Sequence, residues 1–174
     1  MTKKQRKIFY STIFFVGLIS IIWEIKIFRK TVIDLTIPLG IILIVGILAF
    51  LLDFKNFKKT YDYSKFGLYL YSIMHYIIGF GFIACSVFIL ANYHLAKKKA
   101  IVETYKILDR STMPGDRYNP TEYQPLIKIN YKGQIKELVF SHEFYEKMDF
   151  YQTVELKVRK GYFGFDILEN KKLN

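Results

Sequence analysis

An uncharged stretch of 27 residues, 67–93, constrains the fold more than any other feature of the sequence. Its residues, GLYLYSIMHYIIGFGFIACSVFILANY, include no Asp, Glu, Lys or Arg. At a rise of ~1.5 Å per residue, a helix of this length crosses the ~30 Å hydrocarbon core of a bilayer with some tilt. We therefore expect a transmembrane helix here, with the remaining chain organised before and after it.

Two further apolar runs precede this stretch, at about residues 8–28 and 35–52. The first follows a basic arm, and its Tyr10 and Trp23 suit the two membrane–water interfaces, where Tyr and Trp are enriched. A basic start and a short apolar run also resemble a secretory signal, but no small-residue cleavage site follows. The second run has Pro38 in its first turn, where a missing N–H costs little. The two runs predict two more transmembrane helices.

The positive charge is concentrated in the first 99 residues. Residues 1–99 carry 14 Lys and Arg against 4 Asp and Glu, whereas residues 100–174 carry 12 against 11. A nucleic-acid-binding protein needs a basic face on its soluble part, and this part is close to neutral, so we expect no nucleic-acid partner. The formal net charge of +11 instead predicts attraction to the anionic headgroups of membrane lipids.

Three spans place the N-terminus and the C-terminal part on opposite sides of a membrane. Eight Lys and Arg flank the spans on the side of the N-terminus, and six flank them on the other side. The positive-inside rule relates such an excess to the cytoplasmic side. We expect a bacterial plasma (inner) membrane, with the N-terminus cytoplasmic and the C-terminal domain extracytoplasmic.

From residue 100 the hydrophobic period changes from helical to two, which is typical of strands. Lys132-Gly133 predicts a tight hairpin turn between two of these strands. Lys160-Gly161 turns the chain into a last strand with Phe163, Phe165 and Ile167 on one face. The alternating stretches lie near residues 101–107, 127–131, 134–140, 154–159 and 163–167.

One short helix is expected among these strands, over residues 141–148. Ser141 is a good N-cap, and Phe144 and Met148 share a helical face. The predicted fold is therefore a transmembrane domain, residues 1–99, followed by a soluble β domain, residues 100–174. The β domain is predicted as a five-stranded antiparallel barrel-like or sandwich-like structure with one short helix.

The longest irregular segment, residues 109–124, is the candidate partner-binding loop. Long loops in small domains are often functional, and Tyr and Arg are the residues that most often anchor interfaces. The alternative is a flexible loop without a recognition role. The candidate binding residues are Arg110, Asp116, Arg117, Tyr118, Glu122 and Tyr123.

A polar face on the stretch 67–93 is the second candidate site. Its members, spaced by helical periodicity, are Ser72, His75, Gly79 and Ser86. An ionisable group at membrane depth is a functional hypothesis by default. The readings left open for His75 are helix packing, a proton or ligand role, and a haem or metal ligand.

No catalytic motif appears. No glycine-rich phosphate loop or nucleophile-elbow pattern is present, and the lone Cys85 and the isolated His75, His94 and His142 lack metal-site spacing. We therefore expect no enzyme activity, no cofactor and no metal ion.

These observations predict a small integral membrane protein that acts by binding. The leading hypothesis is a non-catalytic accessory subunit of a cell-envelope complex, which binds a partner protein through its β domain and through helix–helix contacts. The expected partners are membrane lipids and another membrane or envelope protein, or a second copy. The alternative is an immunity-type protein that neutralises a toxin by direct binding. A third hypothesis is a channel or transporter subunit that uses the polar face.

Overall fold

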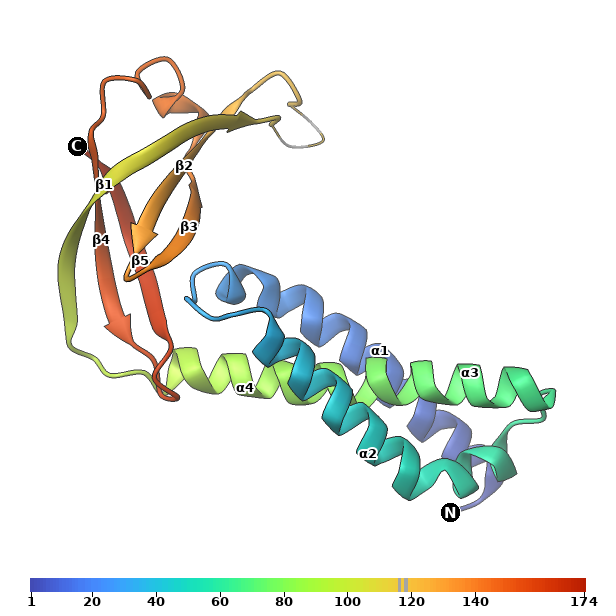
Figure 1. Cartoon of the computed structure of the whole chain (residues 1–174). Coiled ribbons are helices and arrows are strands. Elements are labelled where there is room, and N and C mark those ends of the chain that lie inside the picture. Colours follow the sequence, from blue (N-terminus) through green and yellow to red (C-terminus); the bar gives the residue numbers. More distant parts are fainter. Residues whose placement is uncertain (116, 118) are drawn as a thin grey trace. The chain divides into compact units, whose positions relative to one another are not determined.

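The computed structural model describes residues 1–115, 117 and 119–174. Its first part consists of three long apolar helices (Figure 1). They are α1 (Lys3–Phe28), α2 (Thr36–Thr60) and a third helix over Lys65–His94. All three are long and apolar enough to cross a membrane, which confirms the three helices predicted from the apolar runs.

The helices extend beyond the predicted apolar runs. Helix α2 continues past the predicted end at Leu52 to Thr60, because the following residues, polar apart from Phe54 and Phe57, include neither Gly nor Pro. Helix α1 begins at Lys3, where Thr2 forms a capping box with Gln5. The apolar runs therefore mark where side chains change character, and the backbone remains helical on either side.

The third helix contains a π-helical turn near its middle. It consists of α3 (Lys65–Tyr76), the π-helical η1 (Ile77–Gly81) and α4 (Phe82–His94). Both other helices pack against η1 through glycine, since a Cβ at Gly17 would meet the backbone of Ile78 and a Cβ at Gly46 would meet Ile77. The glycines thus allow three helix backbones to approach closely at one level.

The β part is a five-stranded antiparallel sheet, as predicted. Its strands are β1 (Ala100–Met113), β2 (Gln124–Tyr131), β3 (Gln134–Val139), β4 (Thr153–Lys160) and β5 (Asp166–Leu173). The strand order is β3-β2-β1-β4-β5, and the sheet curls into a half-barrel (Figure 1). The predicted hairpin turn between β2 and β3 is present, with Lys132 and Gly133 both at positive φ.

The apolar core of the half-barrel follows the predicted alternation. Ile127, Ile129 and Tyr131 of β2 are buried, and so are Val154, Leu156 and Val158 of β4. Because successive side chains of a strand point to opposite faces, each set covers one face of the sheet.

Two local predictions of the β part were wrong. The helix expected over residues 141–148 is only the 3-10 helix His142–Phe144, followed by turns, because so short a segment forms too few hydrogen bonds to sustain an α-helix. The last strand begins at Asp166, so Phe163 and Phe165 precede it in the turn after β4.

The chain divides into two compact units. The helical unit comprises Met1–Ala96 together with Gly161–Phe165, and the β unit comprises Lys97–Lys160 and Asp166–Asn174. The five-residue turn between β4 and β5 therefore belongs to the helical unit.

Asn92 of α4 holds this turn. Its side chain accepts a hydrogen bond from the Phe163 backbone N at 3.0 Å and donates one to the Phe165 carbonyl at 3.2 Å. The Phe163 ring stacks on Phe88 of α4, with 4.7 Å between ring centroids. Because Asn92 is fully buried, no water can replace these hydrogen bonds.

Substituting Asn92 should therefore loosen the turn. We expect Asn92→Ala to speed amide hydrogen exchange in residues 161–165 of the full-length chain at least about tenfold, since two buried hydrogen bonds are lost. Asn56→Ala, on the exposed side of α2, is the matched control and should leave exchange in the turn unchanged. Equal exchange rates in the two variants would contradict the role given to Asn92.

Candidate functional site

Two connecting segments meet at one end of the sheet. Strands β1 and β3 end there and strands β2 and β4 begin there, so the described residues of 114–123 (114, 115, 117 and 119–123) and residues 140–152 lie at the same end (Figure 1). We call these two segments the loop end. It is the part of the β unit that contains most of the predicted partner-binding residues.

Arg110 lies in strand β1, whereas the sequence placed it in the loop. Its Nε donates to the Met148 carbonyl at 3.2 Å, and its guanidinium also donates to the Tyr151 carbonyl. Arg110 therefore fastens residues 140–152 to the sheet. A partner would have to compete with these internal bonds to reach its guanidinium.

Tyr123 joins the two segments of the loop end. Its carbonyl accepts a hydrogen bond from His142 Nδ1 at 2.8 Å. Its ring stacks on Tyr145 at 5.9 Å between centroids, and His142 stacks on the same ring at 5.9 Å. Tyr123 was predicted as a binding residue from the sequence, but its contacts with His142 and Tyr145 were not predicted.

Three described residues of the first segment, Gly115, Asn119 and Glu122, lie close together. A Cβ at Gly115 would lie 2.0 Å from the Asn119 carbonyl oxygen, and the Glu122 backbone N donates to that carbonyl. Arg117 and Glu122 are exposed. Asp116 and Tyr118 lie outside the described residues.

Exposed apolar side chains at the loop end were missed by the sequence analysis. Phe150 is 81% exposed and Tyr123 is 44% exposed, and Met113, the residue just before the first segment, is 40% exposed. Phe150 follows the segment predicted as helix, and Met113 ends β1. Their only sequence signal is a large apolar residue next to polar turn residues, which is too common to identify a site.

A polar cluster lies at the opposite end of the sheet. Asp166 of β5 accepts hydrogen bonds from Tyr131 at 2.8 Å and from Lys132 Nζ at 2.9 Å. Lys160 Nζ lies 3.5 Å from the same carboxylate. Since β2 and β5 are not neighbours in the strand order, these bonds cross the curl of the sheet and help to close the half-barrel.

Burial alone would raise the pKa of the Asp166 carboxyl, but the hydrogen bonds from Lys132 and Tyr131 and the nearby positive charges lower it below the usual value. The hydrogen bond to Asp166 raises the pKa of Lys132 in turn. A carboxyl with a lowered pKa in the folded state stabilises the fold above its unfolded pKa of about 3.9, and this stabilisation is lost as the pH falls through the lower, folded value.

Asp166→Asn should therefore cost about 1.5–3 kcal/mol near pH 7, and the difference from the wild type should shrink below about pH 4. Thermal unfolding of both full-length proteins across a pH series measures this difference. A difference that stays constant down to pH 2 would show that the charge of Asp166 does not contribute.

The polar face predicted on the third helix points into the helical unit. Ser72, His75, Gly79 and Ser86 are all buried. Ser72 Oγ donates to the Tyr69 carbonyl, and Gly79 packs against Ile13. The structure thus places all four on the helix-packing side, in two groups separated by the glycine contacts at η1.

The first group lies around Asp53, which the sequence analysis did not select. Asp53 Oδ2 accepts hydrogen bonds from Tyr10 at 2.7 Å and Tyr76 at 2.9 Å, and Oδ1 accepts one from Asn56 at 2.7 Å. One carboxylate therefore connects all three helices. The His75 ring packs nearby against aromatic rings of all three helices, namely Tyr10, Phe14, Phe57 and Tyr76.

The second group centres on Glu24 of α1. Glu24 is 4% exposed, and its Oε1 accepts a hydrogen bond from Cys85 Sγ at 3.4 Å. Ser86 lies beside it on α4. The sequence analysis did not select Glu24. Glu24 lies seven residues after Gly17 and fourteen after Tyr10, which puts all three on the same, packing face of α1.

The two groups do not form a continuous polar path within the described residues. His75 and Ser86 are eleven residues apart, about 16 Å along a helix. Between them lie Gly79 and Gly81, packed against Ile13 and Ile42. In the part of the chain that the structure describes, no three His, Cys, Asp or Glu side chains gather closely enough to hold a metal ion.

Comparison with protein-family models, with curated proteins and with solved structures finds no match for this chain.

Proposed function

We propose that this chain is a non-catalytic integral membrane protein of the bacterial plasma membrane, which binds a partner protein through its β unit as an accessory subunit of an envelope complex. Large apolar side chains exposed along all three helices support insertion in lipid. Examples are Ile19 of α1, Leu52 of α2 and Leu70 of α3. Water would penalise such exposure, whereas the hydrocarbon core does not.

The binding proposal rests on the loop end, whose two segments are held in place by hydrogen bonds and ring contacts and expose aromatic side chains. Tyr123 is fixed by His142 and Tyr145, and Arg110 fixes the second segment. Holding these segments in place before binding lowers the entropy that a partner must overcome. Exposed Tyr123 and Phe150 supply the aromatic side chains that most often dominate interface energies.

Crosslinking and variants of the loop end test this proposal. A photoreactive residue at Arg117 should crosslink one partner in living cells. The double variant Tyr123→Ser with Phe150→Ser should lower that yield at least about tenfold, because each is expected to act as an anchor. The matched control is Ile135→Ser, which removes a 62% exposed side chain of β3 away from the loop end.

Unchanged crosslinking in the double variant would reject the loop end as the binding surface. A partner identified as a toxin would favour the immunity-type alternative over an accessory subunit. The transport hypothesis has less support, because the two polar groups of the helical unit are about 16 Å apart and separated by glycine packing.

The proposed orientation has its own test. The single native cysteine, Cys85, is fully buried, so one introduced cysteine gives an unambiguous signal. Arg117→Cys should react with a membrane-impermeant thiol reagent on intact cells, or on spheroplasts where an outer membrane is present. Labelling only after lysis would place the β unit in the cytoplasm.

A further inference from the structure

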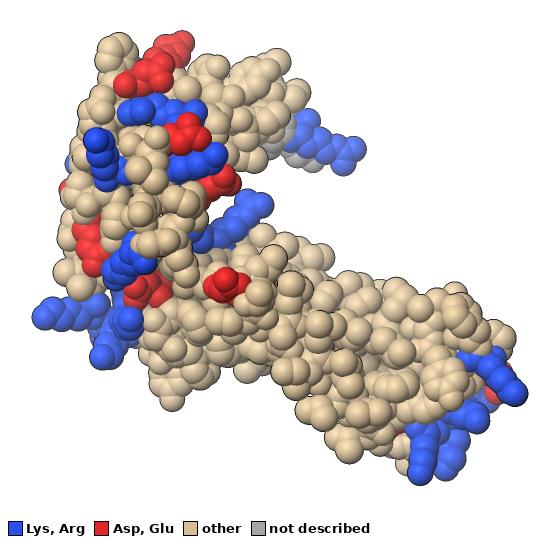
Figure 2. All heavy atoms as spheres, in the orientation of Figure 1, with Lys and Arg blue, Asp and Glu red and all other residues tan. Residues whose placement is uncertain are grey.

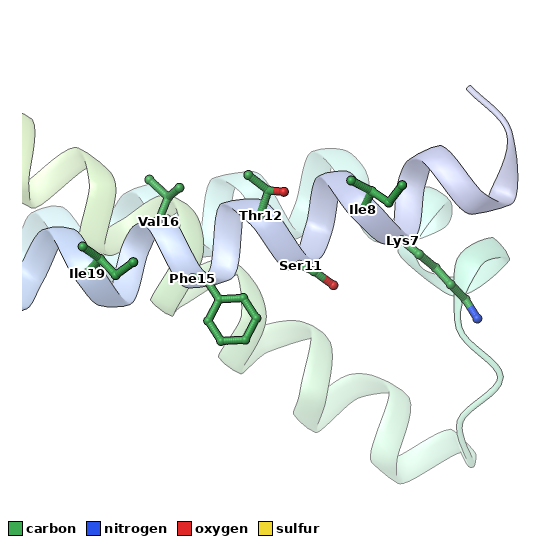
Figure 3. A pocket seen from close by; sticks show the side chains of 7 residues that line it. All are labelled: Lys7, Ile8, Ser11, Thr12, Phe15, Val16 and Ile19. Atoms are coloured by element: carbon green, nitrogen blue, oxygen red, sulfur yellow. The ribbon is translucent and has the colours of Figure 1, made fainter.

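A shallow groove runs along the outer face of α1. It has a volume of about 500 Å³ and is lined by Lys7, Ile8, Ser11, Thr12, Phe15, Val16 and Ile19. Figure 3 shows these side chains along one stretch of the helix, from Lys7 at one end to Ile19 at the other. The opposite face of α1 carries the buried Tyr10, Gly17 and Glu24, so the groove faces away from the other helices.

The groove changes from polar to apolar along its length. Lys7 supplies a cation at one end, next to the apolar Ile8. Ser11 and Thr12 supply hydroxyls one turn further on, of which that of Ser11 also hydrogen-bonds to Tyr61, and Phe15, Val16 and Ile19 are apolar. Twelve residues separate the first and last positions, which is about 18 Å of helix. This order of cation, hydroxyl and hydrocarbon matches a phospholipid that lies along the helix, from phosphate to glycerol to acyl chain.

Charge identifies which lipid would be preferred. The end of the helical unit at which α1 begins carries eight cations, which Figure 2 shows gathered in blue. They are Lys3, Lys4, Arg6, Lys7, Lys55, Lys58, Lys59 and Lys65. The two carboxylates there are already engaged, since Asp62 pairs with Lys3 at 3.2 Å and Asp53 accepts the tyrosine hydroxyls.

A second copy of the chain fits this groove less well. A parallel copy would bring two sets of the same cations together. Of the small residues that let membrane helices approach closely, the lining contains Ser11 and Thr12 but neither Gly nor Ala. Helix α1 uses Gly17 for its closest backbone approach, on its other face.

We propose that the α1 groove is a binding site for one anionic phospholipid, with the phosphate at Lys7 and an acyl chain along Phe15 to Ile19. This inference rests on the proposed insertion of the helices in a membrane.

Site-specific photocrosslinking tests the proposal. The full-length chain, with Phe15 replaced by p-benzoylphenylalanine, is reconstituted into vesicles of equal parts phosphatidylglycerol and phosphatidylcholine. Mass spectrometry should show phosphatidylglycerol adducts in at least about fivefold excess at this position. Lys7→Gln in the same protein should reduce that excess about fivefold, the effect of one cation near an anionic surface.

Two controls make the result specific. The same photoreactive residue at Ile44, an exposed position of α2, should crosslink the two lipids in equal amounts. Lys26→Gln, at the other end of α1, should leave the excess at position 15 unchanged. Equal adducts at position 15, no lipid adduct there, or a crosslink to a second copy would each overturn the proposal.

Failure of this site and failure of the proposed function are distinguishable. Resistance of the reconstituted protein to alkaline washing is measured first. A protein that washes off the vesicles contradicts membrane insertion itself. A protein that remains and shows no preference at position 15 contradicts the lipid site alone.

Discussion

Gly17→Ala is expected to destabilise the helical unit by about 3 kcal/mol or more. A Cβ at position 17 would lie 2.1 Å from the Ile78 carbonyl oxygen and 2.8 Å from that of Gly79. Both obstacles are backbone atoms, so no side chain can rotate away, and α1 must move off the π-helical turn. Overpacking of this kind typically costs 1–3 kcal/mol and occasionally more.

Gly40→Ala is the matched control for this prediction. Nothing lies within 4 Å of the position that its Cβ would occupy, so the change should be neutral, or stabilising by up to about 1 kcal/mol through helix propensity. Unfolding of both detergent-solubilised variants with increasing denaturing detergent gives the comparison. Equal stability of the two variants would contradict the helix contact at η1.

Asp53→Ala is expected to have the second large effect, a loss of about 2–4 kcal/mol from the helical unit. The change removes the acceptor for Tyr10 and Tyr76 and leaves two buried hydroxyl donors without it. Tyr10→Phe and Tyr76→Phe each remove a single donor. They should cost about 1 kcal/mol each, as is usual for one hydrogen bond between membrane helices.

Asp62→Ala is the control for Asp53. Asp62 has a side chain that is 92% exposed and pairs with the exposed Lys3, so its loss should cost less than about 1 kcal/mol. The same unfolding measurement applies. If Asp53→Ala were no less stable than Asp62→Ala, Asp53 would not connect the three helices energetically.

The centres of most helices and strands were predicted correctly from the sequence, whereas several of their ends were not. Long apolar runs with few charged residues indicated three helices because few other structures bury or shield so much apolar surface. Their ends were missed at Thr60 and Lys3 because helix formation continues through polar residues. Alternation identified the first four strands, since a half-buried strand requires it, whereas the alternating residues 163–167 only overlap the start of β5.

Contacts between residues far apart in the sequence could not be predicted from the sequence. Phe163 and Phe165 alternate like strand residues, yet they lie in a turn that Asn92 and Phe88 of α4 hold. Nothing local distinguishes the two cases, because the deciding partners are about seventy residues away. Arg110 was assigned to the binding loop for the same reason, as its carbonyl partners in residues 148–151 were unknown.

The candidate sites could be predicted from the sequence only in part. The aromatic character of the loop was visible at Tyr123, whereas the exposure of Phe150 depends on turns that the sequence does not encode clearly. The burial of Glu24 was easier to predict than the exposure of Phe150. Tyr10, Gly17 and Glu24 recur every seven residues, about two helical turns, and therefore share one face of α1.

The most direct test of the central claim is alkaline carbonate extraction of membranes from cells that express the full-length chain. Helices that lie within the hydrocarbon core resist extraction, so we predict that the chain stays in the membrane pellet until detergent is added. Recovery of the chain in the detergent-free supernatant as a monodisperse species would contradict membrane insertion, and with it the proposed lipid site.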